Sequence, residues 1–354
     1  MKILVIGMGK VGSLVGVLLN KRFDVVGLDK NDPHYTFDLP IPTIKGDVTN
    51  IEFLQSELPK YEAVVSCMPY DLNLPIAEIC HKEGIHYFDL TEDVPTTNAI
   101  RKMAETSTAV MAPQCGLAPG FIGIVGSDLT KRFDKLRDIE LRVGALPQFP
   151  NGQLGYSFTW SPAGVINEYI NDCEVIQNGE RKMVSALDGI EKIYIGGEQF
   201  EAFSTSGGLG TMCETFEGKV DTLNYKTMRY PGHAQLMRFL IYELIMKNRR
   251  EQLEEILTQA KPPVQEDVVY VYAVVEGWIK GRIKREEFYR AYTPIELDGV
   301  SWRAISWTTA ASIAAVVEMV ADGKLLDKGF IKQEDIPFDE LLNTSNGAYF
   351  KDIE

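Results

Sequence analysis

The 354-residue sequence has few histidines and cysteines, the usual ligands of zinc, and none of the patterns that hold disulfide frameworks. It contains four histidines and five cysteines, and no two cysteines form a C-x-x-C pair. The cysteines are widely spaced: Cys67, Cys80, Cys115, Cys173 and Cys213. An odd number of scattered cysteines argues against a disulfide framework, and the small number of histidines argues against a zinc site. We therefore expect no bound metal ion.

Excess positive charge and long hydrophobic runs are also missing. The formal net charge of −14 argues against general binding to a nucleic-acid backbone. The longest apolar stretch, residues 305–321, contains Ser306 and Glu318 and is typical of a buried helix rather than a membrane span. The N-terminus lacks the charged region and cleavage site of a signal peptide. These features predict a cytoplasmic protein that binds neither nucleic acid nor membrane.

A dinucleotide-binding fingerprint occupies the first thirty residues. An apolar run at residues 3–6 leads into GMGKVG at 7–12, and a second apolar run ends in an acid, Asp29. The strand, G-x-G-x-x-G turn, helix, strand and acid follow one another as in a βαβ nucleotide-binding unit. The first glycine permits the tight turn, the second lets the backbone approach a pyrophosphate, and the third lets the helix pack on the strand. The helix N-terminus then favours the phosphates.

Asp29 bears on the choice between NAD and NADP. A carboxylate at the end of the second strand accepts hydrogen bonds from the ribose hydroxyls and repels a 2′-phosphate. We therefore predict NAD, although the adjacent Lys30 is a cation that could tolerate the phosphate. Further cofactor contacts are expected where later strands end. The complete set predicted to bind the cofactor is Gly7, Gly9, Lys10, Val11, Gly12, Asp29, Asp47, Val48, Ser66, Cys67, Met68 and Pro69.

Alternating strands and helices predict a doubly wound, Rossmann-type parallel sheet in the first third of the chain. The expected strands after residue 29 are 42–48, 62–69, 85–90 and 109–112, and the expected helices are 73–83 and 96–106. Between residues 31 and 42 there is little room for a full helix.

The pattern changes after residue 116, and strands dominate. We predict an α+β region with a mainly antiparallel sheet and a hairpin turn at Asn178-Gly179. The expected strands are 139–146, 156–160, 174–176, 182–184, 192–195, 268–275 and 285–292. The expected helices are 119–133, 231–247, 251–260 and 304–321.

Four motifs in this region carry a resemblance to a known family. They are GLAPG (116–120), YSFTWSP (156–162), EAFSTSGG (201–208) and YKTMRYPGH (225–233). In sequence, order and spacing they resemble the saccharopine dehydrogenase-like family, and the last two are most similar to its lysine 6-dehydrogenase branch. The resemblance covers nearly the whole chain.

The resemblance implies an NAD-dependent oxidoreductase that acts on the amine carbon of a basic amino acid. In the lysine 6-dehydrogenase branch, L-lysine is oxidised at the ε-carbon to the semialdehyde with release of ammonia. The saccharopine branch acts instead on a secondary amine, and that reaction is the alternative. A non-catalytic NAD(H)-binding sensor is the alternative of another class.

The resemblance also implies the domain organisation and assembly. Residues 303–354 return to the nucleotide-binding domain of residues 1–120. Residues 121–302 form the substrate-binding domain, through which a homodimer or tetramer assembles.

Amine oxidation requires a general base, because hydride leaves only when the nitrogen has a free lone pair. Asp89, at the end of an apolar strand, is the first candidate, and a helix N-cap is its structural alternative. Tyr70 is the second candidate for orienting the amine or water, unless its ring packs under the cofactor. His233 is the third, and capping is its structural alternative.

The α-carboxylate of an amino acid requires a cation or N–H donors. If residues 225–229 form a strand, Arg229 and Lys226 face opposite sides, so a regular strand cannot present both to the substrate. We favour Arg229 and retain Lys226 as a weaker candidate. Thr205 and Ser206 form a polar loop that could bind the same end of the substrate.

Overall fold

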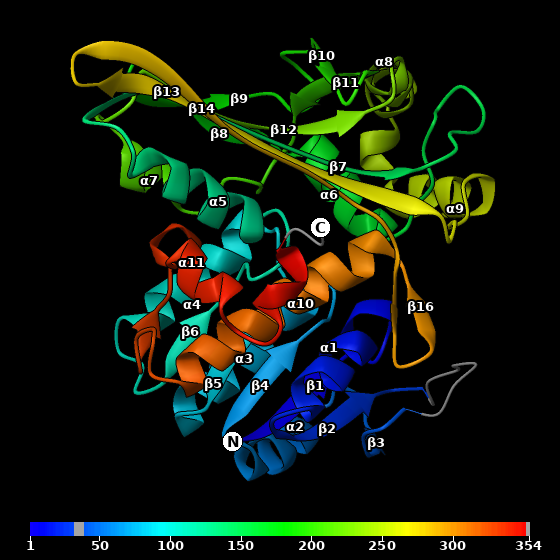
Figure 1. Ribbon diagram of the computed structural model, residues 1–354. Coiled ribbons are helices and arrows are strands. Elements are labelled where there is room, and N and C mark those ends of the chain that lie inside the picture. Colours follow the sequence, from blue (N-terminus) through cyan, green and yellow to red (C-terminus); the bar gives the residue numbers. More distant parts are fainter. Residues whose placement is uncertain (32–38, 352–354) are drawn as a thin grey trace. The chain divides into compact units, whose positions relative to one another are not determined.

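The computed structural model describes residues 1–31 and 39–351. The chain forms two compact units, unit 1 (Met1–Phe121 with Ser306–Glu354) and unit 2 (Ile122–Ile305). The predicted boundaries, after residues 120 and 302, lie one and three residues from these divisions. Figure 1 labels the helices and strands of both units.

Unit 1 contains a seven-stranded sheet in the order β17-β6-β5-β4-β1-β2-β3, in which every pairing is parallel. The strand order reverses between β4 and β1, the topological switch point at which doubly wound sheets bind ligands. The Rossmann-type prediction is confirmed. The strands are β1 (Lys2–Ile6), β2 (Asp24–Asp29), β3 (Thr43–Lys45), β4 (Ala63–Ser66), β5 (His86–Asp89), β6 (Val110–Ala112) and β17 (Gly329–Phe330).

Local sequence explains where the helices of unit 1 begin and end. Helix α3 ends at Gly84, which adopts the left-handed φ of 68°. Helix α4 begins after Asp93, whose carboxylate accepts a hydrogen bond from the Thr96 N–H at 2.9 Å. The helices are α1 (Lys10–Asn20), α2 (Ile51–Glu57), α3 (Asn73–Glu83), α4 (Val94–Ala104), α10 (Ala304–Ala321) and α11 (Phe338–Leu342).

Helix α10 is long and apolar enough to cross a membrane, but 83% of it is buried within the protein. It is therefore the buried helix that the sequence predicts. The first two residues of this helix, Ala304 and Ile305, belong to unit 2, and their N–H groups donate hydrogen bonds to the Asp267 carboxylate of the same unit at 2.6 and 3.0 Å.

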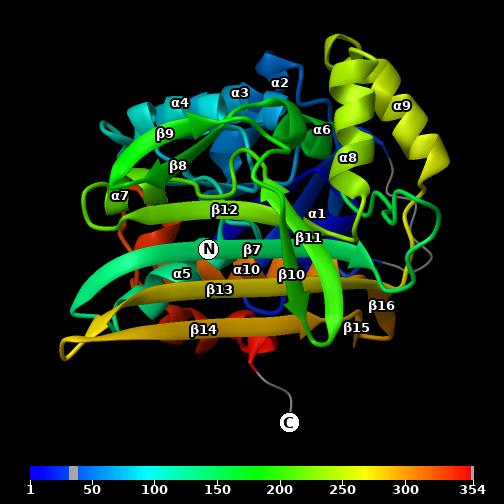
Figure 2. The same ribbon diagram turned by 90° about the horizontal axis from the view of Figure 1, so that it is seen from above.

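Unit 2 is built on an eight-stranded sheet (Figure 2) whose main path is β10-β11-β12-β7-β13-β14. All pairings are antiparallel except that of β12 with β7, so the prediction of a mainly antiparallel sheet is confirmed. The strands are β7 (Lys135–Pro147), β8 (Cys173–Gln177), β9 (Glu180–Val184), β10 (Glu191–Ile195), β11 (Glu198–Ser204), β12 (Thr222–Arg229), β13 (Asp267–Ile279) and β14 (Arg282–Tyr292).

The remaining elements of unit 2 are five α-helices, two short helical turns and a short ribbon. The β8–β9 hairpin turns at Asn178 and Gly179, which both have positive φ, as predicted. The helices are α5 (Phe121–Thr130), α6 (Pro162–Ile170), α7 (Met212–Phe216), α8 (His233–Arg238) and α9 (Arg250–Ala260), and the ribbon is β15 (Ile295–Leu297) with β16 (Val300–Trp302).

Two predicted elements of unit 2 are wrong. Residues 156–160 form no strand: Tyr156 and Phe158 alternate inward as in a strand, but they enter the core from an irregular segment. The helix expected over residues 231–247 is broken. Helix α8 ends at Arg238, a π-helical turn follows, and Ile245 has a φ of 56°, which a continuous helix does not allow. The expected lack of a helix after Asp29 concerns a segment whose residues 32–38 lie outside the described residues.

Candidate functional site

The parallel register of unit 1 brings most of the predicted cofactor residues to one edge of the sheet. Ile6 lies opposite Leu28 on one side and Ser66 on the other, and Ser66 lies opposite Asp89. The glycine turn and the acid ending β2 therefore share the carboxyl edge with the residues that end β4 and β5. This is the edge at which doubly wound sheets bind their ligands.

Each of the three glycines of the turn is favoured at its position for a different physical reason. Gly7 has a φ of 88°, and its N–H donates to the Leu28 carbonyl at 2.8 Å. A Cβ on Gly12 would lie 1.9 Å from the Gly7 carbonyl oxygen, so only glycine lets α1 pack this closely on β1. A Cβ on Gly9 would meet no atom within 4 Å. The protein leaves this space open, which fits the close approach of a pyrophosphate.

Asp29 is fixed beside the glycine turn. One carboxylate oxygen accepts a hydrogen bond from the Met8 N–H at 2.8 Å, and the other accepts one from the Asn31 N–H at 2.9 Å. The side chain remains partly exposed, so its remaining lone pairs can accept hydrogen bonds from ribose hydroxyls.

The exposed Lys30 lies 2.9 Å from the carboxylate of Asp47. Hydrogen bonds from Lys30 and from Thr49 lower the pKa of Asp47 to about 2, so this carboxylate is ionised at neutral pH. The Lys30 cation is therefore already paired with an anion on the adenosine side of the sheet.

The residues after β4 form a packed wall beside the glycine turn. The Ser66 hydroxyl donates to Asn73 at 2.7 Å, and burial raises the pKa of the Cys67 thiol to about 12, so the thiol stays neutral. The Met68 sulfur would lie 2.8 Å from a Cβ on Gly7, and Met68 is only partly buried.

The other predicted residues lie near this edge of the sheet or in the core of unit 1. Pro69 and Tyr70 follow Met68 at the start of a 3₁₀ turn. Lys10 and Val11 begin α1, and Val48 packs partly against the core of unit 1.

Asp89 has no exposed surface and three hydrogen-bond donors. Tyr87 donates its hydroxyl at 2.8 Å, and Thr91 and Gln114 donate backbone N–H groups at 2.9 and 3.0 Å. Burial raises the pKa of Asp89 to about 6. The side chain thereby joins the loops that follow β5 and β6. The helix cap considered for Asp89 is supplied by Asp93 instead.

Glu92 lies at the same edge, and the sequence predictions missed it. It occupies the loop between β5 and α4 and is partly exposed. Burial raises its pKa to about 7, with smaller contributions from Asp93 and Asp89. The available signal was the string DLTED after an apolar strand, in which three carboxylates lie within five residues.

In unit 2, the motifs EAFSTSGG and YKTMRYPGH are neighbours. Glu201 of β11 lies opposite Arg229 of β12. The Glu201 carboxylate accepts hydrogen bonds from the N–H groups of Gly232 and Ala234, at 2.9 and 2.6 Å. Gly232 has a φ of 98°, which favours glycine there. The two motifs therefore form one structural unit at the start of α8.

Arg229 belongs to a buried polar cluster in unit 2. Its Nε donates to the Tyr169 hydroxyl at 3.0 Å, Nη1 donates to the Met228 carbonyl at 2.8 Å, and the guanidinium lies 4.4 Å from the centre of the Tyr156 ring. The predicted Thr205 hydroxyl bonds to that of Thr227 at 2.8 Å, on the same face of β12. Ser206 is buried beside Thr205, and its N–H donates to the Glu168 carbonyl.

His233 is wholly buried in the same cluster. Its Nε2 lies 3.1 Å from the Tyr169 hydroxyl and its Nδ1 lies 3.0 Å from the Leu154 carbonyl. Burial and the charge of Arg229 lower its pKa to about 3. The contacts fit a neutral ring with its proton on Nδ1, and this arrangement favours the structural role that the sequence also allowed.

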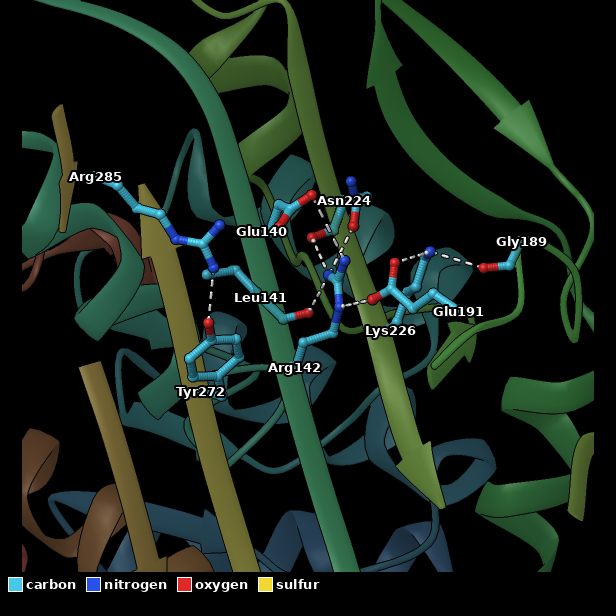
Figure 3. A network of polar contacts seen from close by, with 9 residues as sticks. All are labelled: Glu140, Leu141, Arg142, Gly189, Glu191, Asn224, Lys226, Tyr272 and Arg285. Carbon is cyan, nitrogen blue, oxygen red and sulfur yellow. Dashed lines mark hydrogen bonds and ion pairs between the residues drawn. The ribbon is translucent and has the colours of Figure 1, made fainter. Parts of the chain in front are cut away.

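Lys226 and Arg229 are three positions apart on β12, so their side chains lie on opposite faces of the strand. The Lys226 ammonium lies 2.7 Å from the Glu191 carboxylate and 2.7 Å from the Gly189 carbonyl, and Glu191 also pairs with Arg142 at 2.6 Å (Figure 3). Burial opposes ionisation of Glu191, but these two cations lower its pKa overall. The structure thus commits Lys226 to Glu191, and it does not bring Lys226 and Arg229 together.

The cysteines and carboxylates form no metal site in the described parts of the chain. No group of three or more His, Cys, Asp or Glu side chains within residues 1–31 and 39–351 is placed to hold an ion. The five cysteines are free thiols.

Comparison with known families decides the assignment. Residues 3–114 match the model of the saccharopine dehydrogenase NADP binding domain, and residues 116–346 match that of the saccharopine dehydrogenase C-terminal domain. The chain belongs to the saccharopine dehydrogenase family. The resemblance seen in the four motifs is confirmed at this level, and the expected nearness to lysine 6-dehydrogenase stays a prediction.

Similar proteins include the mitochondrial alpha-aminoadipic semialdehyde synthase of Bos taurus, which is 24% identical over 204 residues. That alignment covers 52% of this chain and 21% of the relative. The saccharopine dehydrogenase [NADP(+), L-glutamate-forming] of Schizosaccharomyces pombe is 22% identical over 41% of this chain and 34% of its own length. The chain thus matches only a fifth to a third of these relatives' lengths.

A solved structure matches along nearly its entire length. The apo saccharopine dehydrogenase (L-Glu forming) of Saccharomyces cerevisiae has a TM-score of 0.75 at 14% identity, over 97% of both chains. At this identity the match establishes a shared fold.

Proposed function

We propose that this chain is a pyridine-nucleotide-dependent oxidoreductase that oxidises L-lysine at its ε-carbon to the semialdehyde. The observation that carries the proposal is the buried guanidinium of Arg229. It is 3% exposed, and no carboxylate among the described residues lies within ion-pair distance of it. A buried, unpaired cation is costly, and a guanidinium can bind a carboxylate, such as the α-carboxylate of an amino acid, through two parallel hydrogen bonds.

Of the two cations predicted to bind the substrate carboxylate, Arg229 and Lys226, only Arg229 forms no ion pair among the described residues. Lys226 and Arg142 both pair with Glu191, which leaves Arg229 as the candidate for substrate binding. Lysine carries one carboxylate, whereas saccharopine carries three. The second candidate is nevertheless the oxidation of saccharopine, because several relatives are named for that activity.

We propose NAD as the preferred nucleotide. Asp29 presents a fixed carboxylate beside the glycine turn, and the nearby Lys30 is paired with Asp47. A 2′-phosphate at this position meets two carboxylates and one cation. The matching family model describes an NADP binding domain, so the two nucleotides must be compared directly.

The bound nucleotide supplies the acceptor for hydride, and the protein's own groups do the rest. In this proposal Arg229 holds the α-carboxylate, and Tyr70 orients the amine or the attacking water. Asp89 holds the loops after β5 and β6 in place through its three hydrogen bonds. A group at the same edge must remove the ammonium proton before hydride can leave.

The test is an assay with NAD or NADP and a panel of lysine, ornithine, saccharopine and simple diamines. We expect lysine and NAD to give the highest kcat/KM, measured by the absorbance of reduced nicotinamide. Turnover of saccharopine without turnover of lysine would select the second candidate. Tight nucleotide binding with no turnover of any amine would select the non-catalytic sensor. A preference for NADP would refute the role given to Asp29.

A matched pair of variants tests the carboxylate site. Arg229→Lys keeps the charge but loses the forked geometry, so the KM for lysine should rise by about tenfold or more while the Kd of NADH is unchanged. Lys226→Met, on the opposite face of β12, should leave the KM for lysine near that of the wild type. The reverse pattern would return the substrate-binding role to Lys226.

We also propose that the chain forms a homo-oligomer through unit 2. In Figure 2 no helix of this unit lies over the middle of the sheet face that is seen. Tyr270 and Tyr272 of β13 and Tyr289 of β14 are partly exposed, and Tyr272 lies opposite Tyr289. Partly exposed aromatic side chains of this kind are common at protein interfaces. Sedimentation of the wild type and of Tyr272→Glu tests the proposal: the wild type should be oligomeric and the variant should dissociate.

A further inference from the structure

The loop between β5 and α4 holds Glu92 in a defined place. On one side of it, the Thr91 N–H donates a hydrogen bond to the Asp89 carboxylate at 2.9 Å, and the Thr91 hydroxyl accepts one from the Asp93 N–H at 3.2 Å. On the other side, the Asp93 carboxylate accepts the N–H and hydroxyl of Thr96, at 2.9 and 2.8 Å. Glu92 therefore projects from a backbone that is anchored before and after it.

This place lies on the nicotinamide side of the nucleotide fingerprint. The strand order reverses between β4 and β1, with β2 and β3 on the adenosine side of the reversal. Strand β5 pairs with β4 on the other side. The loop that carries Glu92 follows β5 directly and lies at the carboxyl edge of the sheet, where the reacting half of a dinucleotide is expected.

Glu92 differs from the carboxylates beside it. Asp89 is wholly buried and accepts three hydrogen bonds, and Asp93 caps α4. The Glu92 carboxylate accepts only its own backbone N–H and pairs with no Lys, Arg or His in the part of the chain that the structure describes. It is also partly exposed. It is thus the uncommitted carboxylate of this loop.

We propose that Glu92 is the general base of the amine oxidation, an inference that rests on the proposed function. Its carboxylate pairs with the substrate ammonium and takes one proton, which leaves a neutral amine. The amine lone pair then forms the C=N bond as hydride leaves the ε-carbon, with both electrons of the C–H bond, for the oxidised nucleotide. Water adds to the resulting iminium carbon and the nitrogen leaves as ammonium, giving the aldehyde. The proton on Glu92 returns to solvent.

The surroundings of Glu92 suit this role. Burial is the largest cause of its raised pKa, which is about 7, and the other charges acting on it are Asp93 and Asp89. A base whose pKa lies near the working pH combines a useful fraction of the ionised form with sufficient basicity. The neighbouring carboxylates also favour the binding of a cationic amine.

The experiment compares Glu92→Gln and Glu92→Asp with a control, Glu105→Gln, at the exposed C-cap of α4, the helix that follows the Glu92 loop. In the wild type, kcat/KM for lysine should rise with pH through about 7. In Glu92→Gln it should fall by about 10²- to 10⁴-fold and lose this rise. Glu92→Asp should keep the rise and recover part of the rate. The control should match the wild type.

Two readouts are independent of turnover. The Kd of NADH, measured by fluorescence, should stay within about twofold of the wild type in all variants, showing that unit 1 is folded. Carbon NMR of labelled glutamate should show one carboxyl that titrates near pH 7 and is missing in Glu92→Gln.

The possible failures can be told apart. An active wild type whose rate and pH profile are unchanged in Glu92→Gln overturns the role of Glu92 alone. Titration of Glu92 near the ordinary glutamate pKa of about 4.3 also overturns that role. A wild type that oxidises no amine overturns the proposed function, and this inference with it.

Discussion

Replacing Gly9 and Gly12 by alanine, one at a time, should separate nucleotide binding from folding. Gly9 has φ −76° and ψ −163°, a conformation open to any residue, and an added methyl meets no atom within 4 Å. Alanine is a poorer helix N-cap than glycine, so Gly9→Ala should destabilise unit 1 by only about 0.5–1 kcal/mol. The methyl fills the space left for the pyrophosphate, so the Kd of NADH should rise at least about tenfold, or about 1.4 kcal/mol.

Gly12→Ala should affect mainly the stability of unit 1, whereas Gly9→Ala should affect mainly nucleotide binding. The new Cβ would lie 1.9 Å from the Gly7 carbonyl oxygen and 3.0 Å from its carbon. These are backbone atoms that follow β1, so α1 must move away from the strand. Overpacking of this kind costs about 1–3 kcal/mol or more. The free energy of unfolding should fall by at least that amount, and weaker nucleotide binding should follow from the displaced turn.

Urea denaturation followed by circular dichroism, together with NADH fluorescence titration, measures both effects. Gly123→Ala in α5 is the control, because its Cβ would make only an ordinary contact of 3.5 Å with Met212. It should bind NADH normally and be no less stable than the wild type. Wild-type NADH affinity in Gly9→Ala would refute the placement of the pyrophosphate, and wild-type stability in Gly12→Ala would refute the packing argument.

Three further substitutions test the buried polar groups. The pKa of Glu92 is raised from 4.5 to about 7 in the folded protein, so the folded state binds this proton more tightly than the unfolded state. The free energy of unfolding of the wild type should therefore fall as pH rises through this range. In urea denaturation, Glu92→Gln should be up to about 3 kcal/mol more stable than the wild type at pH 8 but equal to it near pH 4. A difference in stability between the two proteins that does not change with pH would contradict this. Asp267→Ala leaves the N–H groups of Ala304 and Ile305 without their acceptor and should lower stability by about 1–2 kcal/mol in thermal unfolding, unless the helix end finds water instead. Tyr169→Phe removes the hydroxyl shared by Arg229 and His233 and should cost about 1–3 kcal/mol with no change in NADH affinity; unaltered stability would show that the cluster is not cooperative.

The nucleotide half could be predicted from sequence because its constraints are local. Gly12 must be glycine because of the Gly7 carbonyl, five positions earlier, and Asp29 ends the strand that follows the turn. The alternation of short apolar strands with helices is a pattern of neighbouring residues as well. The two-residue strand β17 is too short to leave such a pattern, and its pairing with β6 joins residues more than two hundred positions apart.

The candidate catalytic residues were harder to predict because their environments are assembled from distant segments. Asp89 accepts a hydrogen bond from Gln114, 25 positions later, and the sequence gives no sign of that donor. His233 contacts Tyr169, 64 positions earlier, and burial together with the charge of Arg229 keeps its pKa low and the ring neutral. A strand end marks where a carboxylate lies, but only its partners show whether the carboxylate is free to react.

The alternation of side chains along β12 said more about which cation could bind the substrate than the presence of two cations on that strand did. Alternation along β12 separates Lys226 from Arg229, and Glu191 then neutralises the first of these cations. Arg229 is left among tyrosines, with Glu168 acting on it only from beyond ion-pair distance. Hydrogen bonds and ring contacts offset part of the cost of burying the guanidinium. In the function proposed, the carboxylate of the substrate offsets the remainder of this cost. The folded protein therefore holds the Arg229 cation in place, and the bound substrate supplies its counter-ion.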